Sequence, residues 1–368
     1  MCYHDKSQTS HDMYTLILSF LTAFSLTYAA IPSIIEIARK KNLVDEPVER
    51  SSHTISTPSL GGIAIFAGAI FSIVLWTPFN DFGNLQYILC SFIIVFLIGA
   101  KDDISPVSPV TKLIGQFMAA FILVFKSNIL LISFYGLFNI DTPFPEWIAA
   151  IFSLFTILVI VNAFNLIDGI NGLAGSIGSL IAGTLGIWFF LTGHIEYAIV
   201  AFSLVGAVVG FLKYNYTPAK IFMGDTGALL VGLICAILII QFIDYNYSME
   251  AGHPYKFQAI PAVAIGIMIL PLFDTMRVFV TRVIRGNSPF HADRRHIHHL
   301  LVDYGLSHMR ATAVLVFINI MFISFVFSVH DKIDQHLLLI ILIIIASTLT
   351  YSLHIAVVRK NRLKNLAS

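Results

Sequence analysis

Apolar stretches long enough to cross a membrane dominate the chain, and about eleven of them can be counted. A run of about 20 apolar residues spans the hydrocarbon core of a bilayer as a helix. The runs show no alternating pattern, which argues against a β-barrel, and backbone groups inside a bilayer must be paired within the segment. The sequence therefore predicts an all-α, polytopic integral membrane protein with about eleven transmembrane helices. The predicted spans run approximately 13–37, 60–77, 85–100, 113–132, 147–164, 172–191, 197–212, 227–243, 259–284, 311–329 and 337–358.

The composition agrees with a membrane protein and excludes several other classes. Hydrophobic residues make up 57% of the 368 residues and charged residues 12%, whereas a soluble domain carries about 25% charged residues. Such a low charge content excludes a soluble enzyme and a disordered chain. The net charge of +1 provides no basic footprint, so we expect no nucleic-acid partner. Cys90 and Cys235 lie within apolar stretches, so no disulfide framework is predicted.

Basic residues are distributed unequally between the two ends of the predicted helices. With eleven crossings, 18 of the 22 Lys and Arg residues fall in loops on one side and 3 on the other. Because cytoplasmic loops carry an excess of Lys and Arg, this asymmetry places the N-terminus outside and the C-terminus in the cytoplasm. Residues 1–368 are predicted to form one integral membrane domain. The cytoplasmic loops, which hold the candidate functional residues, fall near 38–59, 101–112, 162–172, 213–226 and 285–310.

Two adjacent carboxylates follow the third predicted span. Asp102 and Asp103 repel each other, so they are most easily kept charged beside a cation, which indicates metal or phosphate chemistry at the membrane face. The alternative is a solvated loop pair before a Pro-rich turn. Lys112, at the start of the next span, could hold a phosphate as a point charge. A lysine that merely extends its amine to the interface is the alternative.

Three polar residues recur at intervals of three at the end of the fifth predicted span. In a helix, this spacing places Asn162, Asn165 and Asp168 within about 120° of one another. A membrane helix seldom carries two amides and a carboxylate on one face unless they contact water, a ligand or each other. Gly169 and Gly172 then permit a tight turn. The alternative is a helix cap combined with small-residue packing.

Asp225 lies between two glycines at the start of the eighth predicted span. Such a turn leads into a helix N-terminus, whose amides favour anions. Mg²⁺ is usually held by one or two carboxylates together with substrate phosphates, so one aspartate in a phosphate-binding turn is a candidate Mg²⁺ ligand. A simple N-cap is the alternative.

Three histidines occur within four residues between the ninth and tenth predicted spans. His296, His298 and His299 follow Arg294, and imidazole and guanidinium groups suit an anionic, hydroxyl-rich ligand. A zinc site is a second interpretation, although thiolate partners and an HExxH pattern are lacking. A solvated loop is the third.

Four segments together resemble a known family of membrane enzymes. They are KDD at 101–103, NAFNLIDGINGLAG at 162–175, GDTGALL at 224–230 and SPFHADRRHIHHLL at 288–301. The set is similar to the polyprenyl-phosphate N-acetylhexosamine-1-phosphate transferases, in particular to their WecA and TagO branch, which is related to MraY. The segment around His53 resembles the first cytoplasmic loop of that family.

The resemblance implies an activity, a cofactor and a location. Members of the family transfer a sugar 1-phosphate from a UDP-sugar to a polyprenyl phosphate, usually undecaprenyl phosphate in bacteria, and release UMP. They require Mg²⁺ or Mn²⁺. By this resemblance the chain starts lipid-linked cell-envelope glycan synthesis in the bacterial cytoplasmic membrane, with its active site on the cytoplasmic face. The expected partners are a UDP-N-acetylhexosamine, a polyprenyl phosphate and membrane lipid, and a homodimer is a further expectation.

The resemblance also implies a role for individual residues. Asp102, Asp103 and Asp168 match catalytic positions, and Asp225 matches the metal-binding aspartate. The HIHH pattern favours UDP-N-acetylglucosamine over UDP-MurNAc-pentapeptide, the substrate of a phospho-MurNAc-pentapeptide transferase. The matching substrate-binding positions are Lys112, Asn162, Asn165, Asn171, Arg294, His296, His298, His299 and His53.

The chain departs from the family pattern at two positions. Asn171 stands where the family often has a second aspartate, and an amide can hydrogen-bond a ligand but cannot act as a base. Pro106 stands where the paired-aspartate motif often has a further acid or asparagine. Asp102 and Asp103 therefore lack that third member.

Three other functions remain open from the sequence. A transporter or channel would place polar residues along a path across the bilayer, whereas here they gather at one face. A membrane zinc hydrolase would use the histidine-rich loop. A non-catalytic scaffold would leave the acidic clusters without a purpose.

Overall fold

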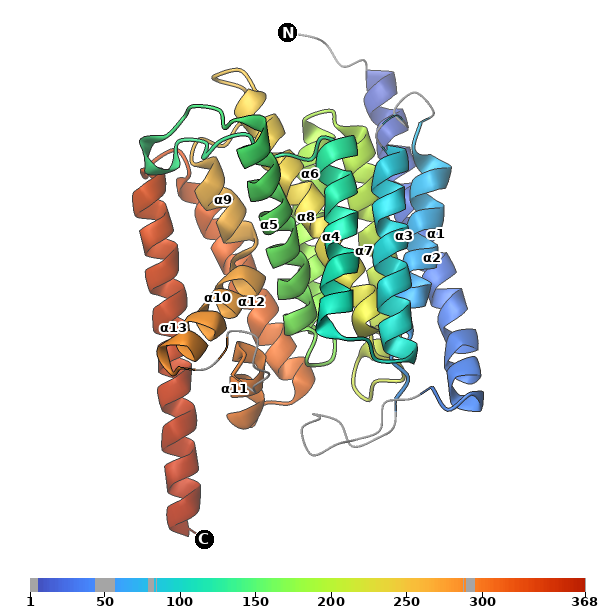
Figure 1. Ribbon diagram of the computed structural model, residues 1–368, viewed down its shortest axis with the longest axis vertical. Coiled ribbons are helices and arrows are strands. Elements are labelled where there is room, and N and C mark those ends of the chain that lie inside the picture. The colour runs from blue at the N-terminus through green and yellow to red at the C-terminus, as the bar shows by residue number, and fades with distance from the viewer. Residues whose placement is uncertain are drawn as a thin grey trace.

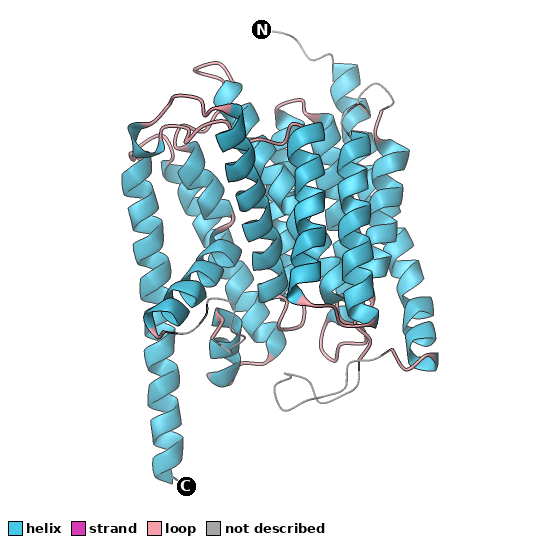
Figure 2. Cartoon of the chain, viewed as in Figure 1, coloured by secondary structure: helices cyan, strands magenta, loops and turns pink. Residues whose placement is uncertain are grey.

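The computed structural model describes residues 6–43, 57–78, 83, 85–286, 288 and 295–367, and these residues are mostly helical (Figures 1 and 2). The described part contains no β-strand, so the prediction of an all-α polytopic protein is confirmed. The helices are α1 (Lys6–Lys40), α2 (Gly61–Trp76), α3 (Leu85–Ile104), α4 (Pro109–Lys126), the 3₁₀-helix η2 (Leu137–Asn139), α5 (Glu146–Ile167), α6 (Leu173–Leu191), α7 (Ile195–Asn215), α8 (Gly224–Ser248), α9 (Ile260–Ile267), α10 (Ile269–Ile284), α11 (Ile297–Asp303), α12 (His308–Val329) and α13 (Gln335–Ala367).

The helices agree with the predicted apolar stretches to within a few residues at most ends. Eight helices of the described part are long and apolar enough to cross a membrane, and the bent pair α9–α10 makes a ninth. The apolar helix α2 is shorter, at 16 residues. The fourth stretch was predicted to run too far, because α4 ends at Lys126 and the following residues are not helical. The chain is a multi-pass membrane protein, whereas the count of eleven spans and the orientation of the termini remain predictions.

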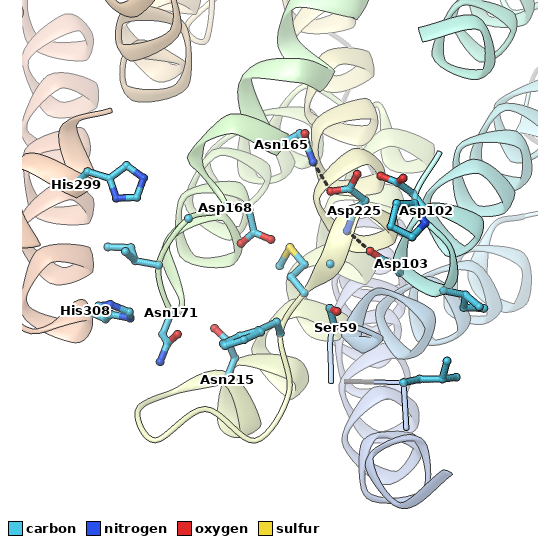
Figure 3. Close-up of a pocket in the computed structure, with 18 of the residues that line it drawn as sticks. Ser59, Asp102, Asp103, Asn165, Asp168, Asn171, Asn215, Asp225, His299 and His308 are labelled. Carbon is cyan, nitrogen blue, oxygen red and sulfur yellow. Dashed lines mark hydrogen bonds between the residues drawn. The ribbon is translucent and has the colours of Figure 1, made fainter. Parts of the chain in front are cut away.

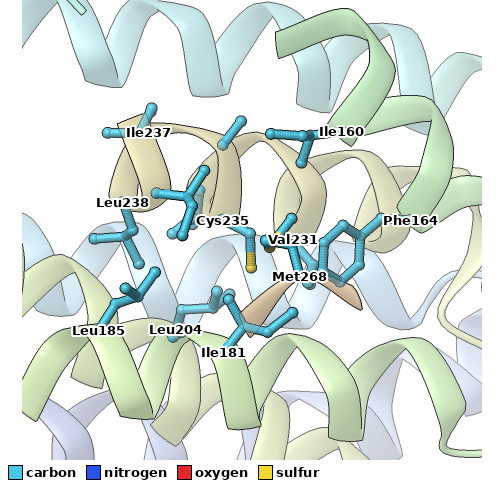
Figure 4. Close-up of a cluster of buried hydrophobic side chains, with 14 of the residues drawn as sticks. Ile160, Phe164, Ile181, Leu185, Leu204, Val231, Cys235, Ile237, Leu238 and Met268 are labelled. Carbon is cyan, nitrogen blue, oxygen red and sulfur yellow. The ribbon is translucent and has the colours of Figure 1, made fainter. Parts of the chain in front are cut away.

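The long helices run side by side, and the connecting segments lie mainly at the two ends of the bundle (Figure 2). Helix α8 lies inside, where it packs against α2, α3, α5 and α6. It is apolar on every side, as expected of a helix surrounded by other helices. Cys235 and Val231 of α8 contribute to a buried apolar cluster with Phe164 of α5 and Ile181 of α6 (Figure 4).

The start of α8 is held close to α2 by small residues. A side chain at Gly62 would place its Cβ 2.1 Å from the backbone nitrogen of Gly227. Only a residue without a side chain permits this approach, which is a common way for membrane helices to pack tightly. The close contact fixes the start of α8, which carries Asp225, relative to the rest of the bundle.

The ninth predicted span, 259–284, is broken into two helices that meet at 84°. Pro271 has no N–H to donate to the carbonyl of Ile267, which breaks the helix at this point. Asn319 of α12 fills the gap: its Nδ2 donates to the Ile267 carbonyl at 3.2 Å, and its Oδ1 accepts from the N–H of Leu270 at 3.3 Å. Helix α10 consequently turns away from the bundle direction and approaches α13 (Figure 1).

The two ends of the molecule differ in what they carry. Helix α1 begins at one end, and α13 extends beyond the other (Figure 1), as expected of an odd number of crossings. We call the end from which α13 extends the C-terminal end of the bundle. The end of α3, the α5–α6 turn and the start of α8 all lie there.

Candidate active site

A cavity of about 690 Å³ lies at the C-terminal end of the bundle (Figure 3). One side of it is acidic and the other carries His299 and His308, with Asp168 between them (Figure 3). Two predicted site residues, His53 and Arg294, lie outside the described residues. The predicted site residues that line the cavity are Asp102, Asp103, Asn165, Asp168, Asn171, Asp225 and His299.

Asp103 ties the end of α3 to the start of α8. Its Oδ1 accepts a hydrogen bond from the backbone N–H of Asp225 at 2.7 Å. Its Oδ2 accepts from the N–H and the hydroxyl of Thr226, at 3.0 and 2.5 Å. The first N–H groups of a helix lack partners within the helix and favour a carboxylate. Both oxygens of Asp103 are thus engaged in holding α8, which makes Asp103 a positioning residue for Asp225.

Asp225 is surrounded by side chains from α4 and α5. Asn165 Nδ2 donates to Asp225 Oδ1 at 2.7 Å, and Lys112 Nζ contacts Asp225 Oδ2. The same ammonium lies 3.4 Å from Asp102 Oδ2 and 3.3 Å from Asn165 Oδ1. Asp102 also accepts the N–H of Val107 at 2.7 Å, which closes the α3–α4 loop. Lys112 is shared between two carboxylates, so this side of the cavity keeps negative charge that a cation can neutralise.

Asp168 follows the last residue of α5 and is half-buried at the cavity. Burial and, to a smaller extent, the negative charge of Asp103 raise the pKa of Asp168 to about 7. Within the described part of the chain, its carboxylate has no hydrogen-bonding or ion-pair partner. An ionised carboxylate in such a place is stabilised by a bound cation.

The three polar residues spaced by three do not all reach the cavity. Asn165 and Asp168 line it, whereas Asn162 lies about one turn deeper. There, Asn162 Nδ2 donates to Gln116 Oε1 of α4 at 2.7 Å and to the Leu158 carbonyl at 2.8 Å. Side-chain amides commonly pair across membrane helices in this way. The structure therefore places Asn162 between α4 and α5 and outside the cavity lining.

Asn171 fixes the α5–α6 turn against two other segments. Its Nδ2 donates to Thr217 Oγ1 at 3.0 Å, and its carbonyl accepts from the hydroxyl of Thr312 at 2.8 Å. Next to it, the N–H of Gly172 donates to Asn215 Oδ1 at 2.6 Å. The side-chain amide of Asn171 thus links the turn to the α7–α8 loop, and the backbone carbonyl of the same residue links it to α12.

His296 is held by a buried carboxylate that sequence analysis missed. Asp274 of α10 is 1% exposed, and its Oδ2 lies 2.9 Å from His296 Nδ1. Its Oδ1 accepts from the N–H of Ile297 at 3.1 Å and from Arg277 at 2.8 Å. A single acid within a predicted membrane span was the available signal, since charged residues in membrane spans usually have a functional partner. Asp274 orients the start of α11.

His298 and His299 occupy different positions. His299 lines the cavity together with His308, the first residue of α12, which sequence analysis also missed. His298 is buried against Gly169, where a Cβ would lie 2.2 Å from His298 Nε2. Burial is the main cause that lowers the pKa of His298 to about 3, so this imidazole is neutral at physiological pH. The histidine segment is therefore packed directly against the α5–α6 turn.

The acidic side of the cavity fits a divalent cation that also binds substrate phosphates. Mg²⁺ prefers oxygen ligands and commonly takes one or two protein carboxylates. Asp225 offers a carboxylate already oriented by Asn165, and Asp168 faces the same cavity. Across the described ranges, no group of three or more His, Cys, Asp or Glu residues is arranged to hold a metal ion. A cation at Asp225 would therefore need further ligands, and the substrate's phosphate oxygens are suited to supply them.

Comparison with known proteins decides the family. The model of glycosyl transferase family 4 matches residues 85–243. The chain is 33% identical over 315 residues to the undecaprenyl-phosphate alpha-N-acetylglucosaminyl 1-phosphate transferase of Pasteurella multocida, with 83% of each chain covered. The chain belongs to the polyprenyl-phosphate N-acetylhexosamine-1-phosphate transferase family. This confirms the family resemblance that the four motifs indicated.

Two further relatives agree with this family. The chain is 30% identical over 313 residues to a probable undecaprenyl-phosphate N-acetylglucosaminyl 1-phosphate transferase of Bacillus subtilis, with 84% of each chain covered. It is 28% identical over 328 residues to the decaprenyl-phosphate N-acetylglucosaminephosphotransferase of Mycobacterium tuberculosis, covering 82% of this chain and 79% of the relative. The relatives' names differ in the polyprenol and agree on N-acetylglucosamine.

Proposed function

We propose that this chain transfers N-acetylglucosamine 1-phosphate from UDP-N-acetylglucosamine to a polyprenyl phosphate, undecaprenyl phosphate in bacteria, and releases UMP. The observation that carries the proposal is the convergence of Asp103, Asn165 and Asp225 at one cavity, where Lys112 contacts Asn165 and Asp225. These residues come from α3, α4, α5 and α8, and the histidine segment faces them across the cavity. Relatives that carry the name of this activity support the same conclusion.

The reaction requires one bond to form and one to break. An oxygen of the lipid phosphate attacks the sugar-linked phosphorus in line, and the electron pair of the broken phosphorus–oxygen bond leaves with UMP. Phosphate esters lose their second proton near pH 6, so at pH 7 most of the acceptor needs no base. The hydrogen bonds of Asp102 and Asp103 accordingly support positioning roles for both carboxylates.

Repulsion between two anionic substrates is the main obstacle to this reaction. Lys112 lies between Asp102 and Asp225, where its ammonium can contact a phosphate oxygen. Asp225, with Asp168 at the same cavity, would hold Mg²⁺ or Mn²⁺, which when bound would neutralise the charge of the diphosphate. Asn165 keeps the Asp225 carboxylate oriented. The chain therefore contributes mainly positioning and charge compensation.

We assign recognition of the sugar nucleotide to the histidine side of the cavity. His299 and His308 line it, and an imidazole can both donate to and accept from hydroxyl and amide groups. His296 and His298 support this side from behind, through Asp274 and through packing against Gly169. A phospho-MurNAc-pentapeptide transferase is the alternative, and the HIHH pattern disfavours it.

A stripe on α4 offers a path for the polyprenyl tail. Leu113, Phe117, Phe121 and Phe125 are spaced by four, so they share one face of the helix. All four are exposed, and the stripe begins next to Lys112. A lipid whose phosphate lies beside Lys112 can extend its tail along this apolar face into the bilayer.

We further propose that the C-terminal end of the bundle faces the cytoplasm in the bacterial inner membrane. The 18-to-3 distribution of Lys and Arg supports this orientation. Residues 1–368 then form one membrane transferase domain whose loops meet at the cavity. The homodimer stays a prediction, for which the sedimentation of the detergent-solubilised protein is the test.

The direct test is a transfer assay with the purified full chain. Undecaprenyl phosphate, labelled UDP-N-acetylglucosamine and Mg²⁺ should yield UMP and a lipid-linked sugar phosphate, and a chelator should stop the reaction reversibly. A parallel reaction with UDP-MurNAc-pentapeptide should give no product. Absence of UMP with every UDP-N-acetylhexosamine would refute the proposed activity.

Replacing Asp225 tests the assignment of the metal-binding carboxylate. Asp225→Ala is expected to lower turnover about a hundred- to a thousandfold, because the diphosphate charge loses its compensation. Asp331→Ala, an exposed acid between α12 and α13, is the control and should keep normal turnover. Both variants should elute as the wild type does in size-exclusion chromatography. Near-normal turnover of Asp225→Ala would contradict the assignment.

A further inference from the structure

A second polar cavity lies beside α13, apart from the active-site cavity. It has a volume of about 390 Å³, and among the described residues none lines both this cavity and the active-site cavity. Three arginines line it: Arg277 of α10, Arg285, which directly follows α10, and Arg295, which precedes α11. We call this cavity the arginine pocket.

The chemistry of the arginine pocket suits an anion. None of the described residues that line it is acidic, and His354 and the hydroxyl of Thr281 add further hydrogen-bonding groups. Arg277 is oriented by Asp274 at 2.8 Å and by the carbonyl of Arg295 at 2.5 Å. Its Nε is buried and lacks a hydrogen-bonding partner among the described residues. Arg285 therefore adds a positive charge to the pocket besides Arg277, which Asp274 balances.

Helix α10 places this charge next to an apolar surface. Arg277, Thr281 and Arg285 are spaced by four and form one row along the helix. On an adjacent row, Val280 and Ile284 are 49% and 78% exposed. A helix with an apolar face beside a basic face is typical of a membrane interface. The 84° bend turns α10 away from the bundle direction, as such a position requires.

The arginine pocket lies at the depth of lipid headgroups. Helix α13 starts at Gln335, at the far end of the bundle, and His354 follows 19 residues later. At about 1.5 Å per residue this is ~29 Å, close to the ~30 Å thickness of the hydrocarbon core. Tyr351, one turn earlier, lines the pocket and is 67% exposed, as is usual for aromatic residues at the membrane–water interface.

An apolar cavity adjoins the arginine pocket. It has a volume of about 130 Å³, lies between α10, α11, α12 and α13, and shares Phe273 and Thr350 with the arginine pocket. Its other lining residues are apolar, such as Leu270, Phe322 and Leu349. A basic pocket next to an apolar cavity matches a molecule with a charged head and a hydrocarbon chain.

We propose that the arginine pocket binds the phosphate of an anionic phospholipid, with part of one acyl chain in the adjoining apolar cavity. Basic pockets between helices at the membrane surface bind anionic headgroups in this way. The lipid would hold α10 against α13. This site does not rest on the proposed transferase activity, since the two cavities have separate linings.

Lipid binding to the detergent-solubilised full chain, measured by native mass spectrometry, tests the proposal. Dioleoyl-phosphatidylglycerol should bind at least about fivefold more tightly than dioleoyl-phosphatidylcholine, because basic side chains at a membrane surface favour anionic lipid by about this factor each. The double variant Arg285→Gln/His354→Gln should abolish that preference. Both replaced side chains are exposed, so the fold should persist. Arg359→Gln, an exposed arginine of α13 outside the pocket, is the matched control and should keep the preference.

Several outcomes would overturn the proposal. Equal binding of the two phospholipids, or equal loss of preference in the control variant, would show that no pocket selects the anionic headgroup. Displacement of phosphatidylglycerol by inorganic phosphate at similar concentrations would identify a free anion as the ligand. Preferential displacement by undecaprenyl phosphate would assign the pocket to the transferase substrate. None of these measurements needs turnover, so failure of the lipid site and failure of the transferase are distinguishable.

Discussion

At the scale of single residues, the carboxylates of the cavity differ in what they contact. Asp103 uses both oxygens to accept hydrogen bonds from the first N–H groups of α8. Asp168 has no partner among the described residues, and its pKa is raised to about 7. Asp103 therefore acts through the position of Asp225, whereas Asp168 is available to a ligand.

Asp168→Asn is expected to stabilise the protein in the absence of divalent cations while reducing transfer. The unfolded chain ionises this carboxyl near pH 4, whereas the folded chain ionises it near pH 7. The folded state therefore loses stability as pH rises from about 4 to 7, and the variant removes that loss. Because the cavity admits water to this half-buried group, we expect a modest effect. The increase in the free energy of unfolding over wild type should be about 1 kcal/mol larger at pH 8 than at pH 5.

Thermal unfolding in detergent with a chelator measures this difference. Asp331→Asn, which removes an exposed carboxyl between α12 and α13, is the control variant. A stability gain for Asp168→Asn that is larger at pH 5 than at pH 8 would show that the folded state stabilises the charged form.

At the scale of elements, the position of α11 depends on its contact with the α5–α6 turn. His298 lies so close to Gly169 that no side chain fits between them. Asp274 of α10 holds the start of α11 from the other direction. The histidine side of the cavity is therefore placed by contacts from two elements, and it should move if either contact is lost.

Gly169→Ala is expected to raise the KM for the UDP-sugar about tenfold or more, since the added Cβ would lie 2.2 Å from His298 Nε2 and displace α11. Gly183→Ala is the matched control, because its nearest neighbouring atom, on Val205, would lie 3.9 Å away. Steady-state kinetics of both variants give the comparison. An unchanged KM in Gly169→Ala would show that the histidine segment does not bind the sugar nucleotide.

At the scale of the whole molecule, the polar chemistry is confined to one end of a largely apolar bundle. The active-site cavity lies at the C-terminal end of the bundle. This arrangement allows a water-soluble sugar nucleotide and a membrane lipid to meet at the interface, where each remains in its own solvent. The orientation of the bundle decides from which compartment the nucleotide must come.

Cysteine labelling tests the orientation. In a chain whose native cysteines are replaced by serine, Asp331→Cys should react with a membrane-impermeant maleimide in intact cells. Asp303→Cys, at the end of α11, should react only after permeabilisation, because the Lys and Arg distribution places that end in the cytoplasm. The reverse pattern of labelling would overturn the proposed orientation.

The helices and the short motifs of this protein could be predicted from its sequence. Runs of about 20 apolar residues determine the helices, because a backbone in hydrocarbon must satisfy its own hydrogen bonds. The paired aspartates, the Asn165–Asp168 segment, the Asp225 turn and the histidine segment identified the family and most of the cavity lining. Each of these is a pattern within a few consecutive residues.

Tertiary structure alone decided which side chains meet. The spacing placed Asn162 on one helix face with Asn165. It could not show that Gln116, 46 residues away from Asn162 in the chain, is the hydrogen-bonding partner of Asn162. The backbone groups left free by the helix break at Pro271 are hydrogen-bonded by Asn319 of another helix. Asp274 belongs to the site only because it contacts His296. The physical reason is the same in each case: a polar group in an apolar bundle takes the nearest partner in space, and helix packing, which brings distant segments together, determines that partner.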